Sequence, residues 1–314
     1  MSNHIRILFG THPIHGWPEE KRQEFLKILK QFRVKDLDTA YIYPDSEAAL
    51  GALNAPSEFI IHTKAPGFKP GCLSKDSVLA GAKKSFEELG TDHVETYFLH
   101  SPDPETPIEE TMEAIQELYK AGRFEHFGLS NFEPSDVSKI HQYASSKGYV
   151  VPTVYQGNYN PVARHSEGEL FPLLRKLGIR FYAYSPLAGG FLVKTAETIR
   201  AGGEGRLDAS TTGGQMYNRL YNKPKLVEAL NAWEKISQDS GISKSQLAYR
   251  WVTYNSQLAT KYQDGIIVGA SRPEQLKETL EEIEKGPLPE KVVEQIEHVW
   301  QTVKDEAPID NYAS

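Results

Sequence analysis

The chain has 314 residues, of which 39% are hydrophobic and 25% charged, and its formal net charge is −7. This composition allows an ordinary folded core, and the acidic balance without a lysine or arginine cluster argues against nucleic acid as a partner. No apolar run is long enough to cross a bilayer, and residues 1–6 lack a signal-peptide core. We therefore expect a cytoplasmic protein that binds neither nucleic acid nor a membrane.

Strand-like and helix-like segments alternate through the first half of the chain. In chain order, they are a strand at 5–10, a helix at 19–32, a strand at 34–37, a helix at 46–53, a strand at 58–64, a helix at 74–89, a strand at 94–100 and a helix at 106–121. Ser74 is typical of a helix N-cap, and Gly90 is typical of a helix end. The single cysteine, Cys72, lies in a loop before this helix and excludes an intrachain disulfide.

The second half of the chain continues the alternation. The expected elements are a strand at 125–130, a helix at 134–147, a strand at 152–156, a helix at 168–177, a strand at 179–185, helices at 225–238 and 243–254, a strand at 265–269, a helix from 273 and a helix at 290–303. A long loop at 187–223, rich in glycine and threonine, follows the seventh strand. Loops of this length are often functional lids, although a disordered surface excursion is the alternative.

Eight strands that alternate with helices favour a closed parallel (β/α)8 barrel, the TIM barrel, over an open doubly wound sheet. The long loop after the seventh strand and the extra C-terminal helix are additions to that plan. No linker, internal repeat or low-complexity tract interrupts the pattern, so we expect one domain over residues 1–314.

Three successive strands end in residues with chemistry. Asp38 follows the second strand, Lys64 ends the third, and His100 ends the fourth, while Tyr43 lies in the loop just beyond Asp38. In a parallel barrel the carboxyl ends of the strands share one face, where active sites are built. A phenol has a pKa of about 10, and it becomes useful for proton transfer when a cation held by a carboxylate stabilises its phenolate. The pattern predicts that Lys64, held by Asp38, lowers the pKa of Tyr43.

The stretches Asp38-Thr39-Ala40-Tyr41-Ile42-Tyr43 and Leu99-His100-Ser101-Pro102, together with the strand-end Lys64, resemble the signatures of the aldo-keto reductases. The similarity runs over nearly the whole chain. It is greatest with the aflatoxin-aldehyde reductase branch, on residues 170–175, 181–190 and 274–276. The resemblance implies a catalytic tetrad of Asp38, Tyr43, Lys64 and His100 and an NADPH-dependent reduction of a small aldehyde or ketone.

No Gly-x-Gly-x-x-Gly follows a strand, so a Rossmann fold is not indicated. The resemblance instead implies that NADPH or NADP⁺ lies across the barrel mouth. The positions that match the family's cofactor contacts are Ser130, Asn131, Gln156, Tyr184, Ser185, Leu187, Gly189, Ser271, Arg272, Gln275 and Glu278. Among these, Ser271 and Arg272 precede a helix N-terminus, which together with a guanidinium suits the 2′-phosphate of NADPH. This chain has Glu278-Thr279 where the family commonly has Glu-Asn.

The substrate side is less defined. His12 and Trp17 follow the first strand and are candidates to line the pocket, and Tyr217 and Arg219 match a segment that reaches the substrate in the aflatoxin-aldehyde branch. Arg219 could receive a substrate carboxylate or form a surface ion pair. The chain ends without the terminal arginine typical of that branch, so a bulkier carbonyl compound is the alternative to a small acidic aldehyde.

Two other functions fit the same residues. One is a cofactor-binding regulatory subunit with little turnover, and the other is a Schiff-base lyase with Lys64 as the nucleophile. No group of His, Cys and Asp residues has a spacing typical of a metal site, so we expect no metal. The protein could be a monomer or a homodimer.

Overall fold

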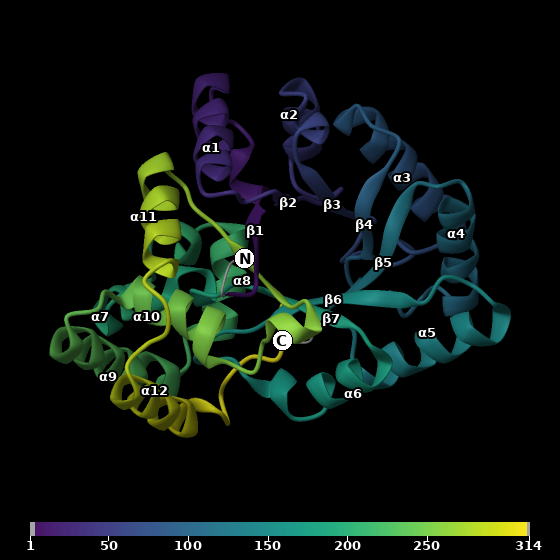
Figure 1. The fold of residues 1–314 in the computed structure, drawn as a ribbon. Helices are drawn as coiled ribbons and strands as arrows, with labels where there is room; N and C mark the ends of the chain where they lie inside the picture. Colours follow the sequence, from purple (N-terminus) through teal and green to yellow (C-terminus); the bar gives the residue numbers. More distant parts are fainter. Residues whose placement is uncertain (1–3, 313–314) are drawn as a thin grey trace.

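The computed structural model describes residues 4–312, and eight parallel strands form a closed barrel in it (Figure 1). The strands follow one another round the barrel in chain order, and the last pairs with the first. Their bounds are β1 Arg6–Gly10, β2 Asp36–Asp38, β3 Ile60–Lys64, β4 Val94–Leu99, β5 Phe124–Ser130, β6 Pro152–Asn158, β7 Arg180–Tyr184 and β8 Gly265–Val268. The predicted (β/α)8 barrel is therefore confirmed.

Helices surround the barrel (Figure 1). They are α1 Glu19–Gln31, α2 Ser46–Ala52, α3 Lys75–Leu89, α4 Ile108–Lys120, α5 Pro134–Lys147, α6 Leu170–Leu177, α7 Ala196–Arg200, α8 Thr212–Tyr221, α9 Pro224–Ser240, α10 Lys244–Arg250, α11 Pro273–Ile283 and α12 Glu290–Val303. The predicted limits of α3 are confirmed, because the Ser74 hydroxyl accepts a hydrogen bond from the Ser77 amide and Gly90 has a left-handed backbone.

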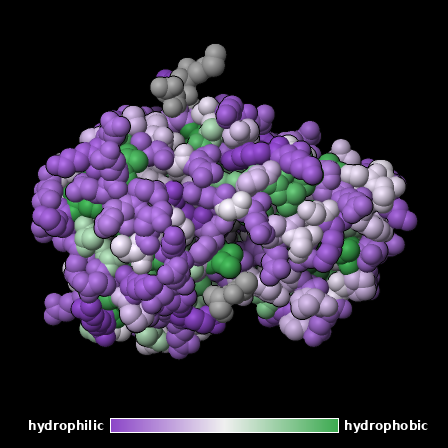
Figure 2. All heavy atoms as spheres, turned by 90° about the horizontal axis from the view of Figure 1, so that it is seen from below, coloured by the Kyte–Doolittle hydropathy of each residue, from purple (hydrophilic) through white to green (hydrophobic). Residues whose placement is uncertain are grey.

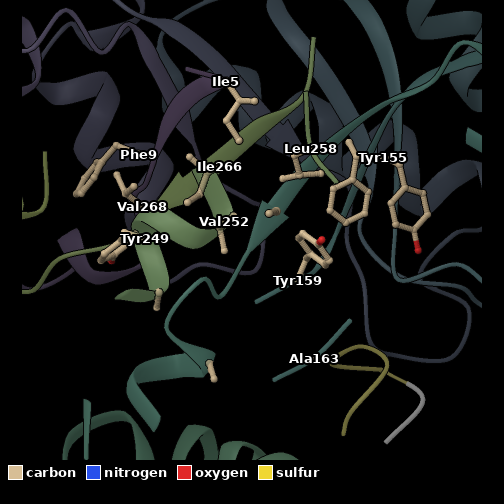
Figure 3. Packing of buried hydrophobic residues seen from close by; sticks show 14 of the residues in the cluster. Ile5, Phe9, Tyr155, Tyr159, Ala163, Tyr249, Val252, Leu258, Ile266 and Val268 are labelled. Carbon is tan, nitrogen blue, oxygen red and sulfur yellow. The ribbon is translucent and has the colours of Figure 1, made fainter. Parts of the chain in front are cut away.

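Two cores lie on either side of the strands, because successive side chains of a strand point to opposite faces. Leu8, Phe98 and Ile267 belong to a small cluster inside the barrel. The neighbouring residues Phe9 and Val268 belong to a larger cluster that packs the strands against the helices. Figure 3 shows the second arrangement, in which Phe9 and Val268 lie beside Tyr249 of α10.

The 187–223 segment is folded, so the alternative of a disordered excursion is wrong. It contains α7, α8 and the 3-10 turns Ala188–Val193 and Gly205–Leu207. Leu207, Leu220 and Tyr221 are fully buried within it. Gly214 is required for this compact path, because a Cβ there would lie 1.8 Å from the Asp208 carbonyl oxygen.

The helix expected at 243–254 differs in its last turns. The α-helix α10 ends at Arg250, and a π-helical turn follows at Trp251–Asn255. The Thr253 hydroxyl donates to the Tyr249 carbonyl, and the Ser256 hydroxyl donates to the Val252 carbonyl. Such side-chain bonds compete with the regular helical ladder, and they accompany its change of pitch here.

The register of β1, β2 and β3 places the first strand-end residues together. Asp38 pairs with Gly10 of β1 and with His62 of β3. Lys64 is two residues beyond His62 and therefore points to the same face of the sheet. His62 itself is fully buried, 2.9 Å from Asp36 and 3.0 Å from Thr96, which is a packing role inside the barrel.

The surface is mainly hydrophilic on the face drawn in Figure 2, where hydrophobic atoms appear in small separate groups. Within residues 4–312, no helix is both long and apolar enough to span a membrane. A groove of about 900 Å³ between α9 and α12 lies outside the barrel. The groove is not lined by any of the four candidate catalytic residues, Asp38, Tyr43, Lys64 and His100.

Candidate active site

Asp38 and Lys64 form a buried ion pair at the carboxyl ends of β2 and β3. The Lys64 ammonium donates to both carboxylate oxygens of Asp38 at 2.8 Å and to the Thr39 carbonyl at 2.6 Å. The Gln156 amide nitrogen donates a further 2.8 Å bond to Asp38. Burial lowers the pKa of Lys64, and the Asp38 carboxylate opposes this effect. Asp38 and Thr39, with Gln156 bonded to Asp38, fix the position of the lysine charge.

Tyr43 lies directly beside this pair. The Lys64 nitrogen is 5.3 Å from the centre of the Tyr43 ring. The His12 ring packs against Tyr43 at 4.9 Å, and the His100 ring lies at 5.8 Å on an edge. The structure thus brings Asp38, Tyr43, Lys64 and His100 together, as the strand-end pattern predicts.

The direction of the Tyr43 pKa shift differs from the sequence prediction. Burial raises the pKa of Tyr43 above its usual value of 10, and the Asp38 charge raises it further, while Arg206 opposes both. The Lys64 charge does not bring the pKa of Tyr43 below its usual value, because Asp38 lies 2.8 Å from Lys64 and the phenol is poorly solvated. The phenol therefore carries its proton at neutral pH, which suits a proton donor.

His100 follows the last residue of β4 and is buried. Burial and the nearby Lys64 charge hold its pKa well below the usual 6.5, so the imidazole is neutral. Within the described part of the chain, its Nδ1 atom is buried and has no hydrogen-bond partner. Buried polar atoms are nearly always paired, so this one indicates a place where a ligand group is received.

Next to His100, Asn131 connects β5 to β7. Its amide nitrogen donates to the His100 carbonyl at 2.9 Å and to the Ser130 hydroxyl at 3.1 Å. Its oxygen accepts a 2.7 Å bond from the Tyr184 hydroxyl. Tyr184 in turn accepts a bond from the Asn311 amide, so the C-terminal segment reaches the same place. Ser130, Asn131 and Tyr184 therefore share one side of the site, as expected.

The chain after β7 has an unusual backbone. Ser185, Ala188, Gly189 and Gly190 all have positive φ values, of 53°, 53°, 67° and 99°. A Cβ on Gly189 would lie 2.2 Å from the Tyr217 ring, so only glycine fits there. The turn closes on itself, because the Ala188 and Gly190 amides donate to the Ser185 and Leu187 carbonyls at 2.8 and 2.9 Å. Leu187 lies within this turn and is half-buried.

The residues expected after β8 lie at the start of α11. Arg272 is the N-cap residue and is exposed, and Ser271 beside it donates from its amide and its hydroxyl to the Gln275 side-chain oxygen. Glu278 is exposed farther along the helix. Arg272 and the helix N-terminus therefore offer positive charge to solvent at one place.

The substrate-side candidates separate into two groups. His12 lines the site next to Tyr43, and Tyr217 is buried with its hydroxyl 3.3 Å from the Ser185 hydroxyl. Trp17 instead packs against Phe25 of α1, with 4.4 Å between the ring centres. Arg219 is exposed on α8.

Comparison with known proteins agrees with this geometry. The model of the aldo/keto reductase family matches residues 6–301. The chain belongs to the aldo/keto reductase family. As an aldo-keto reductase it is an oxidoreductase that acts on small carbonyl compounds.

Several curated aldo-keto reductases and related enzymes are similar over most of their length. The chain is 49% identical to "Oxidoreductase sirO" of Leptosphaeria maculans over 316 residues, which covers 96% of this chain and 95% of that protein. It is 38% identical to human "Aflatoxin B1 aldehyde reductase member 2" over 287 residues, 87% of this chain and 80% of the relative. Identity to "Aldo-keto reductase pigE" of Monascus ruber is 30% over 236 residues, 74% of this chain and 69% of the relative. The predicted relationship to the aflatoxin-aldehyde reductase branch is confirmed.

Three residues of this aldo-keto reductase site escaped the sequence analysis. Arg206 donates a 3.1 Å bond to His12, the Phe68 ring lies next to His100, and the Tyr312 ring lies next to Phe68. The position of Phe68 could have indicated its role. It lies in the loop after the strand that ends in Lys64, just as Tyr43 lies in the loop after Asp38. Arg206 and Tyr312 lie far from any strand end and carry no such signal.

Proposed function

We propose that this aldo-keto reductase reduces an aldehyde or ketone to an alcohol with NADPH, and that Tyr43 donates the proton. The observation that carries the proposal is the position of the Lys64 nitrogen, 2.8 Å from Asp38 and 5.3 Å from the Tyr43 ring centre, beside a neutral His100. The protonated phenol of Tyr43 and the fixed ammonium of Lys64 are then both close to the place where a substrate carbonyl would bind.

The residues present fit a nicotinamide dinucleotide. Ser130, Asn131 and Gln156 supply hydroxyl and amide groups that match a carboxamide, which both donates and accepts. A left-handed turn such as 185–190 suits a pyrophosphate, and Gly189 keeps it compact because the Tyr217 ring occupies the space that a Cβ would take. When bound, the cofactor would supply the hydride.

The chain's own residues then account for the rest of the reaction. Tyr43 would give its hydroxyl proton to the carbonyl oxygen as negative charge develops on it. The ammonium of Lys64, held in place by Asp38, stabilises the phenolate that remains. The neutral His100 would orient the carbonyl oxygen. We further propose that Arg272 binds the 2′-phosphate, which favours NADPH over NADH.

A panel of aldehydes and ketones, followed by the loss of NADPH absorbance with NADH as a control, tests the proposal. Reduction of any of these compounds by the purified protein supports it. Tight retention of NADPH without turnover would favour the regulatory subunit instead.

The lyase alternative requires Lys64 to attack a carbonyl carbon. The fully buried nitrogen already donates three hydrogen bonds to Asp38 and Thr39, which leaves it poorly placed as a nucleophile. Borohydride trapping of a carbonyl compound on Lys64 would contradict the proposed mechanism.

A further inference from the structure

Exposed hydrophobic side chains gather at the mouth of the barrel. Within residues 4–312, six large hydrophobic side chains are exposed. Four of them lie on the loops after β2 and β3 and on the C-terminal segment, namely Ile42, Phe68, Ile309 and Tyr312. Single exposed hydrophobics need no explanation, but a group around one site indicates apolar binding.

Phe68 is held in a backbone conformation that its side chain disfavours. Its φ is 61°, in the left-handed region, where a bulky residue is a genuine outlier. The Phe68 amide donates a 2.8 Å bond to the buried hydroxyl of Ser101, which fixes this conformation. Such conformations persist where the surroundings impose them, and they cluster at sites of function.

The residue before Phe68 allows the loop to approach the catalytic histidine. A Cβ on Gly67 would lie 2.9 Å from the His100 Cβ and 3.3 Å from the Ser101 hydroxyl oxygen, closer than ordinary packing allows. With glycine there, the Phe68 ring stands edge-on to the His100 imidazole, with 5.0 Å between ring centres. The ring is 39% exposed, so part of it remains free for a ligand.

The C-terminal segment provides a second ring. The Asn311 amide donates to the Tyr184 hydroxyl at 3.2 Å, and the Tyr312 amide donates to the Asp310 carboxylate at 2.7 Å. These bonds hold the segment across the barrel mouth. The Tyr312 ring then lies 6.2 Å from the Phe68 ring at an angle of 51° and is 37% exposed.

We propose that Phe68 and Tyr312 form an aromatic clamp that holds the flat apolar body of an aryl or conjugated carbonyl substrate beside His100. The proposal deepens the proposed function and rests on it. Two half-exposed rings that meet at an angle offer a face and an edge to an aromatic ligand, which are the favoured contacts of such rings. A small aliphatic aldehyde would reach Tyr43 and His100 without touching the clamp.

The test compares naphthaldehyde with propanal as substrates of the wild type and of Phe68→Ala. We expect kcat/KM for naphthaldehyde to fall about 10-fold, mainly through KM, because one aromatic contact contributes roughly a 3- to 10-fold change in affinity. The value for propanal should stay within about twofold. Tyr312→Ala should behave in the same way.

Tyr119→Ala is the matched control, since Tyr119 is 42% exposed on α4 and outside the mouth. Phe68→Leu keeps an apolar side chain without a ring, and it should recover only part of the loss. Equal changes for both aldehydes, or no change for naphthaldehyde, would overturn the clamp while leaving the proposed reduction intact.

If the wild type reduces no compound of the carbonyl panel, the proposed function fails, and a binding measurement then tests the clamp. Titration calorimetry of naphthylmethanol, the alcohol product, should then show affinity about 10-fold weaker in Phe68→Ala than in the wild type. Equal affinities would overturn the clamp. Thermal unfolding of each variant checks that it is folded.

Discussion

Arg206 donates a 3.1 Å hydrogen bond to Nδ1 of His12, although the two residues are 194 positions apart. The bond connects the folded segment after β7 to the turn after β1, and the His12 ring packs against Tyr43. Burial and the Arg206 charge lower the pKa of His12 to about 4, so its ring is neutral and accepts the bond at neutral pH. The segment at 187–223 is thus attached beside the proposed proton donor.

Arg206→Gln should raise the pKa of His12 from about 4, because one positive charge is removed. The pKa should remain below 6.5, since burial is the larger cause of the shift. Proton NMR titration of the imidazole measures it. Arg200→Gln is the control, because that residue lies on α7 and pairs with Glu228. An unchanged pKa in Arg206→Gln would show that the 3.1 Å contact is absent in solution.

The same shift predicts how stability depends on pH. His12 is neutral in the folded protein down to about pH 4, whereas in the unfolded chain it takes up a proton below its ordinary pKa of 6.5. The unfolded state therefore binds more protons in this window, and the free energy of unfolding falls as the pH drops from 6.5 to about 4. The pKa of His100 is also lowered in the folded protein, so His100 contributes in the same direction. Urea unfolding at a series of pH values should show a smaller decrease in Arg206→Gln.

Much of the fold and the tetrad could be predicted from local patterns. Strand ends are visible in sequence, and a parallel barrel brings them to one face, so Asp38, Lys64 and His100 could be placed before any coordinates. The pKa of Tyr43 could not be predicted, because it depends on how far the ring is buried and on whether Asp38 neutralises Lys64. The spacing of residues along the chain determines neither the burial of the ring nor the distance between Asp38 and Lys64.

The other contacts that the sequence did not predict are contacts between segments far apart in the chain. Arg206 meets His12, and Tyr312 meets Phe68, through the packing of loops whose paths no periodicity determines. Gln156 was expected to contact the cofactor, and its amide also donates to Asp38 across 118 residues. Trp17 was a pocket candidate because it follows the first strand, but its half-buried ring packs against Phe25 of α1.

Tyr43→Phe removes the proposed proton donor and keeps the ring. We expect kcat to fall by roughly 10²–10⁴-fold, the usual contribution of a positioned acid, with NADPH affinity unchanged. Stopped-flow reduction and fluorescence titration of NADPH measure the two quantities. Tyr41→Phe is the matched control, because Tyr41 precedes Tyr43 by two residues and its ring contacts Lys84 instead. Turnover within a fewfold of wild type in Tyr43→Phe would show that another group supplies the proton.

Lys64→Met should destabilise the protein, because it leaves the Asp38 carboxylate buried without its cation. Removal of one partner of a buried ion pair costs about 3–5 kcal/mol of unfolding free energy. The double variant Lys64→Met with Asp38→Asn removes both charges and should recover most of that loss. Urea unfolding measures both variants. If the double variant is no more stable than the single one, the loss arises from packing and not from the unpaired charge.

Arg272→Ala should distinguish the two nicotinamide cofactors. Arg272 is exposed at the N-cap of α11, where its guanidinium and the helix N-terminus both favour an anion. Loss of one guanidinium–phosphate contact should raise KM for NADPH about 10-fold, which corresponds to about 1.4 kcal/mol. KM for NADH should stay within about twofold, because NADH lacks the 2′-phosphate. Lys277→Ala, on the same helix and paired with Glu281, is the control. Equal increases for NADPH and NADH would place the 2′-phosphate elsewhere.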